Sequence, residues 1–390
     1  MISYNKTWLA NSRLQAQIKK DIHDGFISET EFKLVAEKYP VGFYTPGLLV
    51  RAGLFILTCV IVVFADGLLS LMFSSSGIVT SFGWILFLGI LSYLALEIMV
   101  ATKFHYRSGV DDALLLISLC LFIGGVAIAS SDVNGNPNYT ILSGVVFLIS
   151  LLLTARFADM LTSAVCSSTF LAFIYFLWMS GGAIGLNTVT AVVAIASAFL
   201  YAKVYRYKDR KVFIDYENCL VIVKVACLIA LYASNNYYVL KTLKDELNVP
   251  NKSIPLDSLF LWLWTILIPF IYLWRGIKKK DVILLRTGLI LIAAAIATFR
   301  TYYHILPLDV MLTIGGAVIL AIVYALIKYL KTPKYGFTYA EDGNANLADQ
   351  LKVESLFVAG AFSHAPAAPV DKGVKFGGGD FGGGGSSGDF

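Results

Sequence analysis

The stretch AGLFILTCVIVVFADGLLSLMF (52–73) decides the fold class, because nearly every side chain in it is apolar. The hydrocarbon core of a bilayer is about 30 Å thick and needs about 20 such residues per helix. A helix satisfies its own backbone hydrogen bonds in lipid, so each such stretch is expected to be helical. Comparable stretches follow at 79–101, 113–130, 139–155, 160–180, 186–203, 217–236, 258–274, 282–299 and 309–330. The sequence therefore predicts an all-α, polytopic membrane protein with about ten transmembrane helices.

The composition supports the same class. Hydrophobic residues make up 57% of the chain and charged residues 15%, and the mean hydropathy is +0.73. A soluble domain with these values would expose too much apolar surface. A membrane barrel would show short segments of alternating hydrophobicity, whereas these stretches are continuously apolar. No cysteine belongs to a CxxC pair, so we expect the cysteines to be small core residues, with no metal site and no cofactor.

Lysine and arginine in the connections predict the orientation of the chain. They precede the first stretch and follow the second, fourth, sixth and eighth, whereas the connections after the first, third and fifth hold none. This alternation places both termini on the cytoplasmic side. The net charge of +5 comes from these dispersed loop residues, so the bilayer is the expected partner and a nucleic acid is not. The basic residues of the predicted cytoplasmic connections are Lys103, Arg107, Arg156, Lys203, Arg206, Lys208, Arg210, Lys211, Arg275, Lys278, Lys279 and Lys280.

Three regions are expected. Residues 1–46 have the pattern of a cytoplasmic helical hairpin, in which Ser28 and Glu31 form a capping box that opens the second helix. Residues 47–330 form the transmembrane domain, whose connection at 239–247 is either a short amphipathic helix at the outer interface or an ordinary loop. Residues 331–390 form a cytoplasmic tail with a glycine-rich end that is expected to be disordered.

The N-terminal part resembles a known family. The segment KKDIHDGFISETEFKLVAEKYP (19–40), followed by LLVRAGLFIL (48–57), is similar to bacterial multi-pass membrane proteins catalogued as a domain of unknown function. The resemblance covers roughly residues 10–70. It implies a bacterial inner-membrane protein without an assigned activity, and it supplies no catalytic residues.

Four ionisable residues stand out within the predicted spans: Asp66, Glu97, Lys224 and Arg286. Such a group costs about 2.5–3.5 kcal/mol at the centre of a membrane helix, so each needs a physical explanation. Lys224 and Arg286 are expected either to extend toward the headgroups or to pair with Glu97, which lies at a similar estimated depth. For Glu97 a structural pair and a protonated carboxyl compete with a role in a proton step. Asp66 is either an interfacial carboxyl or a functional one.

Two functions remain open at the level of sequence. The first is a transporter-like protein for a small solute, supported by the span count and the intramembrane carboxyls. Its further support is a weak internal repeat, in which LLVRAGLFIL (48–57) matches VILLRTGLILI (282–292). The alternative is a non-transporting scaffold or sensor that acts through its cytoplasmic hairpin or tail, where a protein partner would bind. No catalytic motif is present, so the sequence predicts that the protein is not an enzyme.

Overall fold

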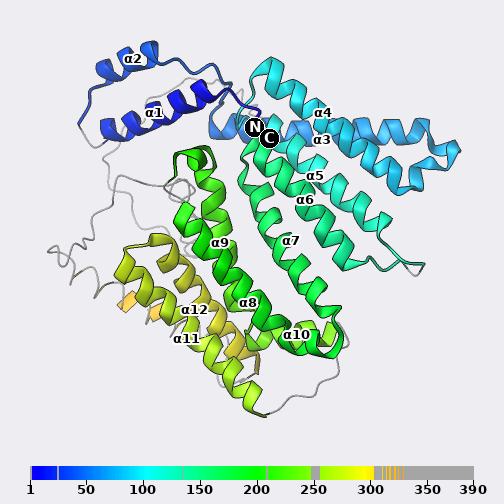
Figure 1. Cartoon of the computed structure of the whole chain (residues 1–390). Coiled ribbons are helices and arrows are strands. Elements are labelled where there is room, and N and C mark those ends of the chain that lie inside the picture. Colours follow the sequence, from blue (N-terminus) through cyan, green and yellow to red (C-terminus); the bar gives the residue numbers. More distant parts are fainter. Residues whose placement is uncertain are drawn as a thin grey trace, which may run out of the picture. The chain divides into compact units, whose positions relative to one another are not determined.

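The computed structural model describes residues 2–302 except 24–25, 134, 208–209 and 247–254, together with isolated positions between 310 and 328. Within this part the chain forms α-helices and short 3₁₀ turns, and no strand (Figure 1). The predicted all-α class is confirmed for the described residues.

Eight helices are long and apolar enough to cross a membrane. The helix α9 (Glu217–Ala233) corresponds to the predicted span 217–236 but has only 17 residues. The predicted span 309–330 and the tail 331–390 lie outside the described residues, apart from isolated positions, so the count of ten remains a prediction. The eight helices are α3 (Leu48–Met72), α4 (Phe82–Lys103), α5 (Val110–Ala129), α6 (Tyr139–Phe157), α7 (Met160–Met179), α8 (Gly182–Tyr207), α11 (Pro255–Lys279) and α12 (Val282–Tyr302).

Local side-chain caps set where several of these helices begin. The Ser81 hydroxyl accepts from the backbone N–H of Trp84 at the start of α4, and the Asp159 carboxylate accepts from that of Thr162 at the start of α7. Such caps satisfy N–H groups that have no partner inside the helix. Ala158, with a φ of 50°, ends α6 immediately before Asp159. This sharp reversal lets α6 and α7 pack side by side.

Sequence neighbours form the main helix pairs, which are α4 with α5, α6 with α7, α8 with α9 and α11 with α12. Two apolar clusters stabilise the structure. One includes Leu96, Leu119 and Phe157 of α4, α5 and α6, and the other includes Leu228 and Leu284 of α9 and α12. Of the eight candidate spans, α3 is the one in which no residue is buried; among the helices it packs mainly on α5.

The predicted N-terminal helices are confirmed as α1 (Lys6–His23) and α2 (Glu29–Lys38). Both halves of the capping box are present: the Ser28 hydroxyl accepts from the Glu31 N–H, and the Glu31 carboxylate accepts from the Ser28 N–H. Hydrogen bonds from the backbone and hydroxyl of Ser28 lower the pKa of Glu31. Local sequence was sufficient to find this feature because all its atoms lie within one helical turn.

The connection at 239–247, for which the sequence leaves helix and loop open, is helical as far as Glu246, in α10 (Tyr237–Glu246). Residue 247 lies outside the described residues. The Asn236 side chain accepts from the Val239 N–H and donates to the Tyr232 hydroxyl, so it joins α9 to the start of α10. Leu240 is buried, as expected for the apolar side of an amphipathic helix. Its position at a membrane interface remains a prediction.

Candidate functional site

The N-terminal residues before α1 lie at the C-terminal ends of α4 and α6. The Ser3 backbone N–H donates to the Arg156 carbonyl at 2.9 Å, and the Ser3 hydroxyl donates to Glu97 Oε2 at 3.2 Å. A segment remote in sequence thus bonds to two helices at once.

Glu97 and Arg156 form the polar centre of this site. The guanidinium donates through Nε to Glu97 Oε1 at 2.8 Å and through Nη2 to Oε2 at 3.0 Å. This two-pronged geometry is the strong form of an arginine–carboxylate pair. The Tyr93 hydroxyl also donates to Oε1, at 2.7 Å. The prediction that Glu97 pairs with Lys224 or Arg286 is wrong, because the last turn of α6 supplies a closer cation.

Tyr4 anchors the same segment through its ring. It is buried against Tyr106, Phe43 and Phe157, with ring centroids 4.9, 6.1 and 6.3 Å away. Burial, followed by the negative charge of Asp111, raises the pKa of the Tyr4 phenol. The Tyr4 phenol is therefore neutral at physiological pH, and its ring packs as an apolar side chain with one polar end.

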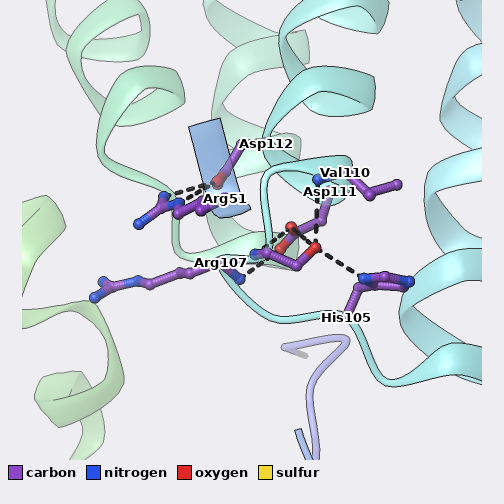
Figure 2. A network of polar contacts seen from close by, with 7 residues as sticks. Arg51, His105, Arg107, Val110, Asp111 and Asp112 are labelled. Atoms are coloured by element: carbon purple, nitrogen blue, oxygen red, sulfur yellow. Dashed lines mark hydrogen bonds and ion pairs between the residues drawn. The ribbon is translucent and has the colours of Figure 1, made fainter. Parts of the chain in front are cut away.

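A buried polar network closes the connection between α4 and α5 (Figure 2). Asp111 accepts from the backbone N–H groups of Arg107 and Ser108, at 2.7 and 2.8 Å, and from the Ser108 hydroxyl at 2.9 Å. His105 Nδ1 lies 2.8 Å from Ser108 Oγ. Since the hydroxyl proton goes to Asp111, Nδ1 of His105 must donate to Ser108 Oγ.

This network contains serine, histidine and aspartate but lacks the arrangement of a hydrolase triad. In a triad the histidine stands between the other two residues and takes the serine proton. Here Ser108 stands between His105 and Asp111, and its hydroxyl donates a hydrogen bond to the aspartate. Ser108 is also 0% exposed, so no substrate reaches its hydroxyl. The network is therefore a structural closure of the loop.

The first turn of α3 contacts the start of α5, next to the polar network. Arg51 Nε and Nη2 lie 2.9 and 2.7 Å from Asp112 Oδ2 (Figure 2). Gly109 adopts a φ of 94°, and a Cβ at this position would lie 2.1 Å from the Arg51 carbonyl oxygen. The crossing of α3 and α5 therefore requires glycine at 109.

A second anchor joins α1 to the connection between α8 and α9. Arg13 of α1 forms an ion pair with Asp215, which lies in the 3₁₀ turn η3 (Lys211–Tyr216). In the same turn the Tyr216 hydroxyl donates to the Ala155 carbonyl of α6 at 2.6 Å. The N-terminal segment and α1 thus contact the α4–α6 ends and the α8–α9 turn together.

Lys224 has its own partner elsewhere. Its ammonium lies 2.5 Å from Asp281, and the two side chains are only 7% and 13% exposed. Asp281 also accepts from the backbone N–H of Ile283 at 3.1 Å and so caps α12. Tyr201 lies beside this pair, with its ring centroid 5.9 Å from Lys224 Nζ. Its buried hydroxyl has no hydrogen-bond partner in the described part of the chain. The expectation that Lys224 extends to the headgroups is therefore wrong.

The four predicted intramembrane residues do not form one cluster. Glu97 and Lys224 belong to the two separate pairs described above. Arg286 lies on an exposed side of α12. Asp66 is half-buried on α3 and has no hydrogen-bond or ionic partner among the described residues.

The two segments of the proposed internal repeat lie in different surroundings. A Cβ on Gly288 would touch Leu273, whereas one on the matching Gly53 would touch nothing within 4 Å.

No group of three or more His, Cys, Asp or Glu side chains that could hold a metal ion occurs among the described residues. Comparison of the chain with family models, curated proteins and solved structures finds no match. The resemblance to a family of unknown function thus remains a prediction, and function must be argued from the geometry alone.

Proposed function

We propose that this protein is a non-transporting membrane scaffold or sensor that acts through its N-terminal hairpin. The observation that carries the proposal is the double attachment of the N-terminal part, through Ser3 and Tyr4 to the α4–α6 ends and through Arg13 to the α8–α9 turn. A ligand that binds the released hairpin more tightly than the docked hairpin would shift the equilibrium toward release. Release would break contacts both at the α4–α6 ends and at the α8–α9 turn.

The hairpin also offers a surface for a protein partner. No residue of α2 is buried, and the side chains of Phe26 and Leu34 are 82% and 66% exposed. A protein docked on the hairpin would cover both apolar side chains. We propose a cytoplasmic protein as that partner and assign no enzymatic activity to the chain.

Transport by a path through the helices is the second candidate. The specific observation in its favour is the buried Lys224–Asp281 pair beside the Tyr201 hydroxyl, which has no hydrogen-bond partner among the described residues. Ion pairs inside membrane proteins often mark proton or solute pathways. The separation of the ionisable groups into distinct pairs is the reason to prefer the first candidate.

Proteoliposomes test the choice. We expect no proton uptake above that of empty vesicles under a potassium diffusion potential, and no added swelling in a panel of small sugars, amino acids and polyols. Asp66→Asn and Lys224→Met should leave both readings unchanged. A saturable flux through the unmodified protein, above that of empty vesicles, would overturn the scaffold proposal in favour of transport.

We further propose a bacterial inner-membrane location with both termini in the cytoplasm, based on the distribution of lysine and arginine. Reporter fusions at Gly135 and Lys252 are expected to read as periplasmic, and those at Lys208 and Lys279 as cytoplasmic. A reversed reading at any one of the four positions contradicts the ten-span topology.

A further inference from the structure

Basic side chains gather where α8 and α11 end. They are all exposed or half-buried, and none of them lies within ion-pair distance of a carboxylate in the described part of the chain. The nearest acid of the α11–α12 connection, Asp281, is already paired with Lys224. We name this set the α8–α11 basic surface, and it consists of Lys203, Arg206, Arg210, Arg275, Lys278 and Lys279.

Aromatic rings organise this surface. Lys279 of α11 lies 4.4 Å from the ring centroid of Tyr205 on α8, which brings the two helix ends together. Lys278 lies 5.3 Å from the Trp274 ring, and Lys203 lies 5.2 Å from the Phe199 ring. Each ring holds a cation near its face and limits the conformations of that side chain. Three of the six cations, on two helices that are distant in sequence, are thus held beside aromatic rings.

Apolar side chains continue from the basic surface along both helices. On α8 Phe199 is exposed, and on α11 Phe270, Trp274 and Ile277 are exposed. A soluble acidic partner gains little from this combination. A phospholipid matches both parts, since its phosphate meets the cations while its acyl chains lie on the apolar side chains.

We propose that the α8–α11 basic surface binds the headgroup of an anionic phospholipid. The lipid bridges the ends of α8 and α11 and holds together the helices around the Lys224–Asp281 pair. Two observations carry this assignment: the excess of unpaired cations, and the exposed aromatic and aliphatic side chains directly beside them on the same helices. It stands independently of the scaffold proposal.

The test uses the full-length protein in a mild uncharged detergent. Thermal unfolding is followed while dioleoyl-phosphatidylglycerol or dioleoyl-phosphatidylcholine is added. We expect saturable stabilisation by the anionic lipid alone. The triple variant Arg206→Gln/Lys278→Gln/Lys279→Gln should need at least about tenfold more of that lipid, a change equivalent to about 1.4 kcal/mol.

Matched controls separate a built site from net charge. Lys6→Gln/Lys19→Gln/Lys33→Gln removes the same charge from the hairpin and should leave the lipid response unchanged. Lys278→Arg/Lys279→Arg keeps the charge and should retain binding. Equal protection by both lipids, an equal loss in the hairpin control, or full protection by glycerol phosphate or a soluble acidic peptide would overturn the proposal.

Discussion

Lys224→Met is expected to lower the free energy of unfolding by about 3–5 kcal/mol, the usual cost of removing one member of a buried ion pair. The loss arises because Asp281, only 13% exposed, is left without its cationic partner. Asp281→Asn retains an oxygen for capping α12, so the double variant Lys224→Met/Asp281→Asn should recover part of the loss. Denaturant or thermal unfolding of the purified protein measures each step of this double-mutant cycle.

The pair between Arg13 and Asp215 provides the control, because its arginine is 41% exposed. An exposed pair is worth about 0–1 kcal/mol, so Arg13→Gln should change global unfolding little. A double variant no more stable than Lys224→Met alone would show that the two side chains are not coupled.

Gly109→Ala is expected to prevent stable packing of α3 on α5. The substitution forces a Cβ to within 2.1 Å of the Arg51 carbonyl oxygen while holding an L-residue at a φ of 94°. Backbone strain and overpacking each cost about 1–3 kcal/mol, and a clash with backbone atoms cannot be relieved by a rotamer change. We expect strongly reduced yield of folded protein in fluorescence-detected size-exclusion chromatography.

Gly77→Ala is the matched control for this prediction. Gly77 also has a positive φ, of 66°, but a Cβ there would meet nothing within 4 Å. Its cost is only that of holding an L-residue in the left-handed backbone conformation, about 1–2 kcal/mol. If the two variants give the same yield, the close approach of α3 and α5 at Gly109 is not a constraint.

Features set by local sequence were predictable. The capping box at Ser28 and Glu31 follows from spacing within one helical turn. For the connection at 239–247 the spacing left helix and loop both open, and the structure shows the helix α10 there. The polar closure of the α4–α5 connection was missed although it has the same kind of signal. Ser108 and Asp111 are spaced as in a capping box and precede an apolar run.

Pairing of charges across helices was not predictable, because depth in the membrane does not determine which helices are neighbours. Glu97 and Lys224 were assigned similar depths, but their partners are Arg156 and Asp281. Arg156 was interpreted only as a topology signal of a connection. Its second role depends on the sharp turn after α6 and on the packing of α4 near α6, which a single sequence does not reveal.

The docking of the N-terminal part was equally hidden. Residues 1–46 were expected to form a cytoplasmic helical hairpin, and nothing in their composition indicated which helix ends Ser3 and Tyr4 contact. The aromatic residues at 4, 43 and 106 form no motif in the sequence, and only the structure shows that Tyr4 packs against the other two rings.

The distance between spin labels at Gln17 on α1 and Val212 in η3 tests the docked hairpin most directly. The labels are placed in a background without the native cysteines and measured by double electron–electron resonance in nanodiscs. We expect a single narrow distribution, because the buried Tyr4 and the Arg13–Asp215 pair together hold α1 near this turn. Tyr4→Ala/Arg13→Gln should broaden it by releasing both anchors. A broad distribution in the otherwise unmodified chain, or no change in the double variant, would contradict the account.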